Sequence, residues 1–286
     1  MTGALSTGAG RAPRLAAERM LAAVAGHTGV RLDYLGPCSG GEVGAAYVRW
    51  PDGRRGVLGR DRQDVAGLVR LAGDAGVPVP GYDLVAPLDG GGWAVVQRLL
   101  PGAAPATVDR SLFDGLLAIN SRLRGLLADR DDLPPLPLHL RSSGPGFCVH
   151  ESLAGYDRRT ARLLERVRAV GAERDAADGP DLVHADFHPG NVLVDAGRIT
   201  GVVDWDGAAR GDGWLDLVTL RFDLALRAPT LGSELAERLR AAVPPDRLRA
   251  YWAHMALRQV DWSIRHHGPA EVDRWLEVAE AAPLPW

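Results

Sequence analysis

Three polar residues, Asp186, Asn191 and Asp204, lie close together in the sequence among short apolar segments. Asp186 and Asn191 are five residues apart in a predicted loop between two short strands, Leu182-Val183 and Val192-Leu193-Val194, so both could point into one cleft. Asp204 ends the next strand. Mg²⁺ prefers one or two carboxylates plus phosphate oxygens, and Asn191 and Asp204 offer such ligands. Asp186 could then accept or orient a hydroxyl proton. This set suits phosphoryl transfer, which requires positioning and charge neutralisation.

A plain alternative is an Asp- and Asn-rich hairpin whose polar residues only form surface turns. The apolar runs on either side argue against it, because strands such as 192–194 and 202–203 are predicted to be buried. Polar side chains between buried strands are poor candidates for mere surface residues.

The elements that must position these residues fall into two parts. The first hundred residues read as mostly antiparallel sheet with one inserted helix, after an N-terminal helix at 15–24. The predicted strands are 31–35, 45–50, 55–60, 82–86 and 93–99, and the inserted helix starts near 65 and ends at Gly76. Pro101-Gly102 marks a hinge, and predicted helices follow at 112–126, 157–170 and, three or four in number, over 212–281. The predicted fold class is therefore α+β, with two lobes, 1–100 and 101–286.

The segment His184-Ala185-Asp186-Phe187-His188-Pro189-Gly190-Asn191, with Val202-Val203-Asp204-Trp205 after it, resembles the catalytic and metal loops of aminoglycoside phosphotransferases and their relatives. Gln97–Gly102 and Gly211–Leu217 are similar to flanking segments of that family. The resemblance implies a bilobal protein-kinase-like fold. Residues 1–100 would bind the nucleotide, and 101–286 would hold the catalytic loop, the metal loop and an acceptor pocket. Ala185 stands where the family usually has glycine.

The resemblance also implies individual roles. Asp186 would be the catalytic base or hydroxyl-orienting residue, and Asn191 and Asp204 would be the Mg²⁺ ligands. His184, His188 and Asp216 are expected to be structural. For His188 a phosphate contact is the alternative, and Asp216 would accept backbone donors from the catalytic loop. Asp206 stays open between a solvated turn residue, a supporting group and a docking carboxylate for the substrate.

For the nucleotide, the glycine-rich stretch 36–44 could bring backbone N–H groups to phosphates, with Ser39, Gly40 and Gly41 as the candidates. The family uses a lysine on the third strand, yet every one of the 33 basic residues here is arginine. Arg60 is the first candidate for the phosphate-binding cation and Arg55 the second, with Asp64 as the acidic partner. The alternative is that Arg60 is only a surface strand residue. Arginine is bulkier than lysine and planar, so the exchange is not neutral.

The backbone from Gln97 to Leu99 would face the purine base. ATP is the expected nucleotide, GTP stays open, and Mg²⁺ is the expected metal. The candidate acceptor-binding residues are Asp157, Asp206, Asp261 and Trp262. Carboxylates and a tryptophan would suit a polycationic compound.

The leading functional hypothesis is an O-phosphotransferase for a cationic antibiotic, either an aminoglycoside or a basic peptide of the capreomycin and viomycin kind, which would confer resistance. One alternative is a metabolic kinase for choline, another amino alcohol or a sugar. The other is a nucleotide-binding pseudokinase, which only the missing lysine supports.

Composition narrows the setting. The chain has 286 residues, 46% hydrophobic and 24% charged, with a net charge of −3, so a nucleic-acid partner is not expected. Cys38 and Cys148 are expected to be free thiols rather than a disulfide or metal site. No signal peptide or membrane-spanning segment is predicted. A cytoplasmic enzyme is therefore expected.

Overall fold

The structure, a computed structural model, describes residues 11–38, 45–61, 65–145 and 147–282, and the side chains from residue 14 onward. The chain forms two compact units. Unit 1 comprises the residues up to Ala103 together with Leu193–Asp206, and unit 2 comprises Ala104–Val192 together with the residues from Gly207.

Unit 1 is built on a five-stranded antiparallel sheet with the strand order β1-β2-β3-β5-β4. Its strands are β1 (Asp33–Pro37), β2 (Ala46–Arg49), β3 (Arg55–Asp61), β4 (Tyr82–Pro87) and β5 (Trp93–Arg98). Gly53, in the turn between β2 and β3, has a φ of +86°, which glycine adopts readily. The predicted hairpin signal at this turn is confirmed.

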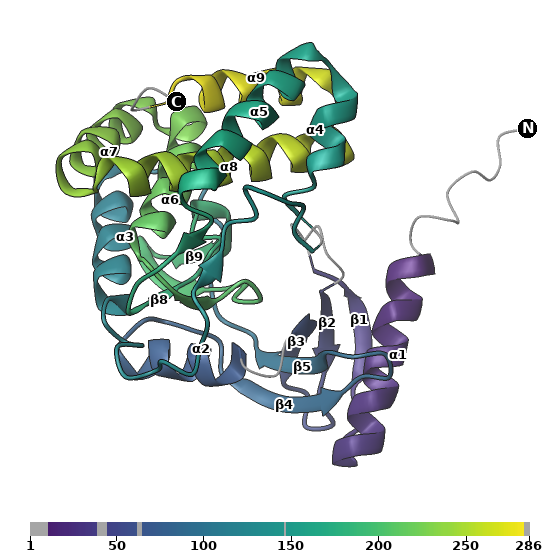
Figure 1. Ribbon diagram of the computed structural model, residues 1–286. Helices are drawn as coiled ribbons and strands as arrows, with labels where there is room; N and C mark the ends of the chain where they lie inside the picture. The colour runs from purple at the N-terminus through teal and green to yellow at the C-terminus, as the bar shows by residue number, and fades with distance from the viewer. Residues whose placement is uncertain (1–10, 39–44, 62–64, 146, 283–286) are drawn as a thin grey trace, which may run out of the picture. The chain divides into compact units, whose positions relative to one another are not determined.

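One face of this sheet is covered by α1 (Arg11–Thr28), which runs beside β1 in Figure 1. Met20 and Val24 of the helix form one core cluster with Val48, Leu58 and Val96 of the sheet. Side chains alternate between the faces of a strand, so the neighbours of Leu58 and Val96 in sequence point to the opposite face. A ligand of the sheet must therefore use the face opposite α1.

Two further elements complete unit 1. Helix α2 (Val65–Asp74) is followed by Gly76, with a φ of +80°, and prolines then prevent its continuation. The hairpin β9 (Val192–Asp195) and β10 (Arg198–Val202) attaches at Val202, whose N–H donates to Pro78 O at 2.7 Å. This attachment fixes the start of the loop that contains Asp204.

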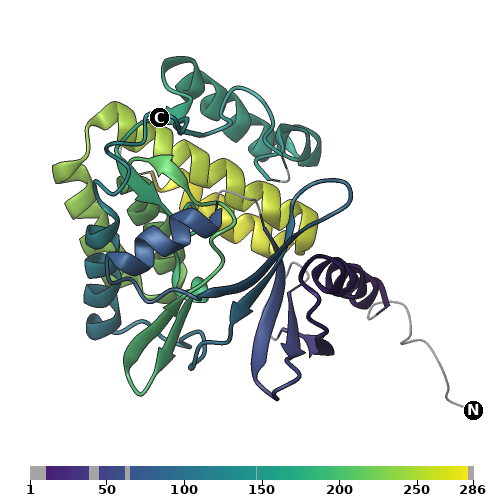
Figure 2. The same ribbon diagram turned by 90° about the horizontal axis from the view of Figure 1, so that it is seen from below.

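Unit 2 is mainly helical. Its helices are α3 (Arg110–Leu123), α4 (His150–Tyr156), α5 (Arg158–Glu173), α6 (Trp214–Arg227), α7 (Pro229–Ala242), α8 (Pro245–His266) and α9 (Pro269–Glu280). Its short strands are β6 (Leu136–Pro137), β7 (Ala176–Ala177), β8 (Asp181–Val183) and β11 (Ala209–Gly211), and a 3₁₀ turn, η1, spans Pro189–Asn191. Helix α8 is largely buried and packs along α9, as Figure 2 shows for the two yellow helices.

The predicted α+β class is confirmed, and the C-terminal region contains four helices within its described residues. The sequence did not predict helix α4, because its seven residues are too few to show a helical period. The boundary after residue 100 stays a prediction, and the structure groups 193–206 with unit 1. Every helix among the described residues is too short or too polar to cross a bilayer.

Candidate active site

The predicted catalytic loop follows the buried strand β8, and its first residues are hydrogen-bonded to Asp216 of α6. The Asp216 carboxylate accepts hydrogen bonds from the backbone N–H groups of His184 and Ala185, at 2.8 and 2.9 Å. Asp216 is fully buried. These contacts are those expected for a structural Asp216, so the side chain fixes the two residues before Asp186.

Ala185 has a φ of +66°, in the left-handed region that favours glycine. The family's usual glycine at this position thus has a conformational reason. Here an alanine adopts the same backbone, at a cost of about 1 kcal/mol. Such a conformation persists only where its surroundings hold it.

Both carboxylate oxygens of Asp186 have partners. Oδ1 lies 2.9 Å from Arg258 NH2 of α8 and 3.5 Å from His188 Nε2. Oδ2 accepts from Asn191 Nδ2 at 3.1 Å, and the same amide nitrogen donates to Asp186 O at 3.0 Å. The side chain of Asp186 keeps 22% of its exposure, so it is restrained and still accessible.

Burial acts to raise the pKa of Asp186, but the charge of Arg258 and the hydrogen bond from His188 outweigh it and hold the pKa well below its usual range. Asp186 is therefore an ionised carboxylate and a weak base. It can accept a hydrogen bond from a hydroxyl and orient it, and it can take the proton late in a transfer. For Asp216, burial raises the pKa to about 7, against the effect of its two backbone donors.

The two histidines of the loop have different surroundings. His184 is fully buried, and its Nδ1 accepts from the N–H of Asp186 at 3.3 Å. His188 Nδ1 accepts from Gly190 N at 3.1 Å and so caps the 3₁₀ turn. Burial acts to lower the pKa of His188, yet the hydrogen bond to Asp186 and its charge raise it overall. Both placements support the predicted structural roles.

The predicted metal ligands belong to different units, Asn191 to unit 2 and Asp204 to unit 1. The amide nitrogen of Asn191 is engaged by Asp186, so its amide oxygen is the atom that could bind a cation. Asp204 has a φ of +65°, and the loop after β10 is anchored by Trp205, whose Nε1 donates to Val202 O at 2.8 Å. Among the described residues no group of three His, Cys, Asp or Glu side chains could hold a metal ion. These oxygens suit Mg²⁺ that takes its remaining ligands from phosphate and water.

In unit 1, the two candidate phosphate-binding arginines of β3 lie on opposite faces of the sheet. Arg60 shares the α1 face with Leu58, and its NH2 donates to Gly91 O at 2.6 Å in the turn between β4 and β5. The Arg55 guanidinium lies on the other face, 5.0 Å from the centre of the Tyr47 ring. The placement therefore favours Arg55, and the role of Arg60 stays a prediction. The predicted nucleotide residues Ser39, Gly40, Gly41 and Asp64 lie outside the described residues.

A polar cluster stands on the face opposite α1. The Tyr82 hydroxyl donates to Asp61 Oδ2 at 2.5 Å, and the Gln97 side chain hydrogen-bonds to the same hydroxyl. Burial raises the pKa of Tyr82, as do the hydrogen bond to Asp61 and its charge, with a smaller effect from Asp206. The predicted nucleotide-binding Gln97 and the ambiguous Asp206 thus lie near one phenol, and Leu99 follows directly after β5. Asp61 thus places a carboxylate on the same face of β3 as Arg55.

The other predicted acceptor-binding residues have contacts within the protein. Asp157 caps α5 by accepting from Thr160 N at 2.7 Å. Asp261 is fully buried and accepts from Val149 N at 3.0 Å and from the Arg265 guanidinium. Trp262 stacks on His266 with ring centres 3.7 Å apart. These contacts suit structural roles, and acceptor binding by these residues stays a prediction.

Sequence reasoning did not identify Arg258, which contacts the catalytic loop. The sequence does carry a weak signal, because Arg258 and Asp261 place charges among the apolar residues Leu257 and Val260 of a buried helix. A charge on a buried face needs a partner. Periodicity alone could not show that the partner is Asp186, which lies far away in the sequence.

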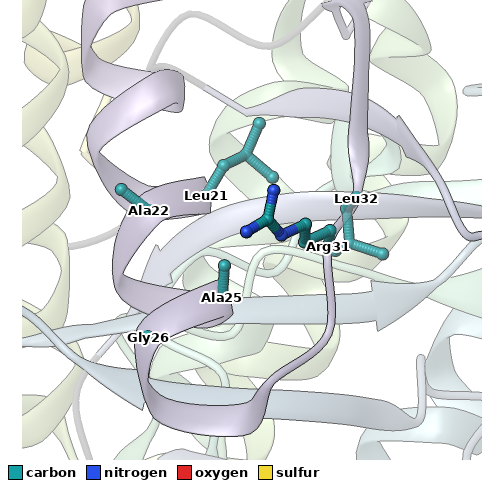
Figure 3. A pocket seen from close by; sticks show the side chains of 6 residues that line it. All are labelled: Leu21, Ala22, Ala25, Gly26, Arg31 and Leu32. Atoms are coloured by element: carbon teal, nitrogen blue, oxygen red, sulfur yellow. The ribbon is translucent and has the colours of Figure 1, made fainter.

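Unit 1 contains a hollow of about 420 Å³. It is lined by Leu21, Ala22, Ala25, Gly26, Arg31 and Leu32 of α1 and the segment after it. Figure 3 shows mostly small or apolar side chains and one guanidinium there. It contains none of the predicted site residues.

Comparison with known proteins gives a family and a fold. The model of the family described as "Phosphotransferase enzyme family" matches residues 44–257. A curated relative, hygromycin-B 4-O-kinase of Escherichia coli, is 38% identical over 96 residues. That match spans 31% of this chain and 28% of the relative.

Solved structures resemble the whole chain at low identity. A thermostable mutant of the aminoglycoside phosphotransferase APH(4)-Ia, in a ternary complex with AMP-PNP and hygromycin B, has a TM-score of 0.66 at 19% identity. The match covers 92% of this chain and 97% of that one. The spectinomycin phosphotransferase APH(9)-Ia, in complex with ADP and spectinomycin, has a TM-score of 0.62 at 13% identity and covers 93% and 98%. These matches confirm the predicted kinase-like fold.

Proposed function

The chain belongs to the phosphotransferase enzyme family, and we propose that it transfers the γ-phosphoryl group of a nucleoside triphosphate to a hydroxyl of a cationic antibiotic. The observation that carries this proposal is the arrangement of Asp186, an accessible, ionised carboxylate held between Arg258 and Asn191. The proposal covers an aminoglycoside or a basic peptide as acceptor, ATP as the first nucleotide and resistance as the biological outcome.

In the proposed reaction, the acceptor hydroxyl donates a hydrogen bond to the Asp186 carboxylate. The hydroxyl oxygen attacks the γ-phosphorus, the bond from that phosphorus to the β–γ bridging oxygen breaks, and the nucleoside diphosphate leaves. The acceptor proton passes to Asp186 as the new P–O bond forms. A carboxylate with a lowered pKa fits this sequence, because a loose transition state needs the nucleophile oriented more than deprotonated.

Mg²⁺, when bound, would neutralise charge on the transferring and leaving phosphate groups. Asn191 and Asp204 would hold it. Gln97 and Leu99 would line the base-binding segment, and Arg55 is the better-placed candidate to neutralise phosphate charge.

A cationic acceptor is supported by Asp223 of α6, a carboxylate near the catalytic loop. Its Oδ1 accepts from Arg227 Nε at 3.0 Å, while its buried Oδ2 has no hydrogen-bond partner within the described residues. The charges of His188 and Asp223 act on each other's pKa, so the two side chains are neighbours. The negative charge of Asp223 beside the loop would attract a cationic acceptor.

An acceptor panel tests the proposal. Purified protein with Mg²⁺ and either ATP or GTP is incubated with hygromycin B, spectinomycin, capreomycin, viomycin or choline, and products are identified by mass spectrometry. A phosphorylated antibiotic is expected, and Asp186→Ala serves as the blank. Phosphorylation of choline alone would replace the proposal by a metabolic kinase, and nucleotide binding without transfer to any acceptor would favour a pseudokinase.

A further inference from the structure

Arg258 reaches the catalytic loop from α8 and contacts two consecutive residues of it. Its NH2 lies 2.9 Å from Asp186 Oδ1, and its NH1 donates to Ala185 O. The guanidinium lies 5.1 Å from the centre of the Phe147 ring, and only 17% of the side chain is exposed. The two contacts therefore form in a poorly solvated place, where they gain strength.

The contact with Ala185 falls on the one strained residue of the loop. Ala185 adopts a φ of +66°, and its peptide groups are held from both sides, the N–H by Asp216 and the carbonyl oxygen by Arg258. Two partners from two helices thus support a conformation that alanine alone disfavours. Without Arg258, the loop could relax toward an ordinary alanine conformation.

The contact with Asp186 is complementary to that of Asn191. Arg258 binds Oδ1 and Asn191 binds Oδ2, so the plane of the carboxylate is set from both ends. A planar guanidinium with fixed donor directions can contact a side-chain oxygen and a backbone oxygen together, whereas an ammonium acts as a point charge. The pair of contacts to Asp186 and Ala185 therefore requires the planar guanidinium with its two donor groups, and a positive charge alone does not explain it.

We propose that Arg258 is a positioning residue for phosphoryl transfer: its two-pronged contact holds Ala185 in the left-handed conformation and thereby fixes the direction of the Asp186 carboxylate. The inference rests on the proposed function, because it takes Asp186 as the group that orients the acceptor hydroxyl. It predicts that arginine is needed here in order to keep an alanine at the position of the usual glycine.

The test compares three variants in steady-state transfer from ATP to hygromycin B. Arg258→Ala should lower kcat by about 100-fold, the scale of a misplaced catalytic group, with the KM for ATP unchanged. Arg258→Lys should stay well below wild type, because it keeps the charge and loses the fork. Arg249→Ala is the matched control on the same helix, since the ion pair of Arg249 within the described part of the chain is a long contact of 3.9 Å to an exposed Glu173.

Two rescues separate positioning from general damage. Ethylguanidinium added to Arg258→Ala should restore part of kcat, because it can occupy the vacated space. Ala185→Gly introduced into Arg258→Ala should also restore part of kcat, because glycine adopts the left-handed conformation without strain. Far-UV circular dichroism and thermal unfolding check that each variant is folded.

Several results would overturn the inference: wild-type kcat in Arg258→Ala, full activity in Arg258→Lys, or a loss of kcat that neither rescue reverses. If the wild-type protein phosphorylates no acceptor, the proposed function fails instead. The inference is then judged on the slow hydrolysis of ATP, where water takes the place of the hydroxyl and the same variants and rescues apply.

Discussion

The charged residues of the predicted catalytic loop in unit 2 and those of strand β3 in unit 1 differ in their contacts. In the loop, Asp186 is bound by Arg258 and Asn191, and the backbone before it is bound by Asp216. On β3, the Arg60 guanidinium lies on the α1 face and donates a hydrogen bond to the backbone carbonyl of Gly91. The Asp61 carboxylate accepts a hydrogen bond from the Tyr82 hydroxyl. The loop thus has the residues of the family's pattern and adds Arg258, whereas β3 carries arginines where the family uses a lysine. The charged groups of the loop are therefore bound to one another, and the two arginines of β3 lie on opposite faces of the sheet.

The largest effect is expected from Asp186→Asn, which tests the loop side of this comparison. The amide cannot accept the proton, so kcat should fall by about 1,000-fold while nucleotide affinity stays near wild type. Initial rates and isothermal titration with ATP give the two quantities. Asp178→Asn, at an exposed carboxylate, is the control. A kcat within a few-fold of wild type would remove Asp186 from the centre of the site.

The next largest effect, on the free energy of unfolding, is expected from the Asp216 carboxylate that binds the backbone of the loop. Asp216→Asn replaces a two-oxygen acceptor by an amide that can satisfy only one of the N–H groups of His184 and Ala185, and the unfolding free energy should fall by about 3 kcal/mol. Urea unfolding measures it. Asp109→Asn, at the cap of α3, should be nearly neutral, because asparagine caps as well as aspartate. Equal stability of the two variants would show that the loop is not held in this way.

The pH dependence of stability tests whether His254 of α8 is buried as a neutral side chain in unit 2. His254 is fully buried, its Nδ1 donates to Leu138 O at 2.8 Å, and burial lowers its pKa to about 4. The unfolded chain binds the proton near the usual pKa of about 6.5, so stability falls as pH decreases from that value towards 4. The loss should reach about 2 kcal/mol at pH 5. Urea unfolding of wild type and His254→Gln across this range should show a shallower slope in the variant, and parallel curves would contradict the assignment.

The smallest effect separates the two arginines of β3. Arg55→Ala should raise the KM for ATP about tenfold, the scale of one charge-assisted hydrogen bond, and Arg60→Ala should leave it near wild type. Each variant is the control for the other, since both arginines lie on one strand and on opposite faces. The reverse order would restore Arg60 as the phosphate-binding residue and weaken the contrast between the two regions.

The sequence was most informative where a function depends on neighbours along the chain. The spacing of Asp186 and Asn191, the turn at Gly53 and the apolar stripe of α1 all predict features that the structure contains. Local geometry determines each of these, so the pattern of side chains is enough.

Other features depend on contacts that no local pattern encodes. The faces of Arg55 and Arg60 follow from the register of β3 against β5 and from the side that α1 covers. Arg258 becomes part of the site only through tertiary packing of α8. The bonds of Asp261 to Val149 and Arg265 likewise depend on tertiary packing, and its predicted role in acceptor binding stays a prediction.

Direct observation of the transferred phosphoryl group tests the central claim, that this chain moves phosphate from ATP to a hydroxyl. Phosphorus NMR follows purified protein with Mg²⁺, ATP and hygromycin B, with Asp186→Asn as the blank. In wild type only, the γ-phosphorus signal should decrease while a phosphomonoester signal of the acceptor grows at the same rate. Growth of inorganic phosphate alone, or of the ester in Asp186→Asn as fast as in wild type, would contradict it.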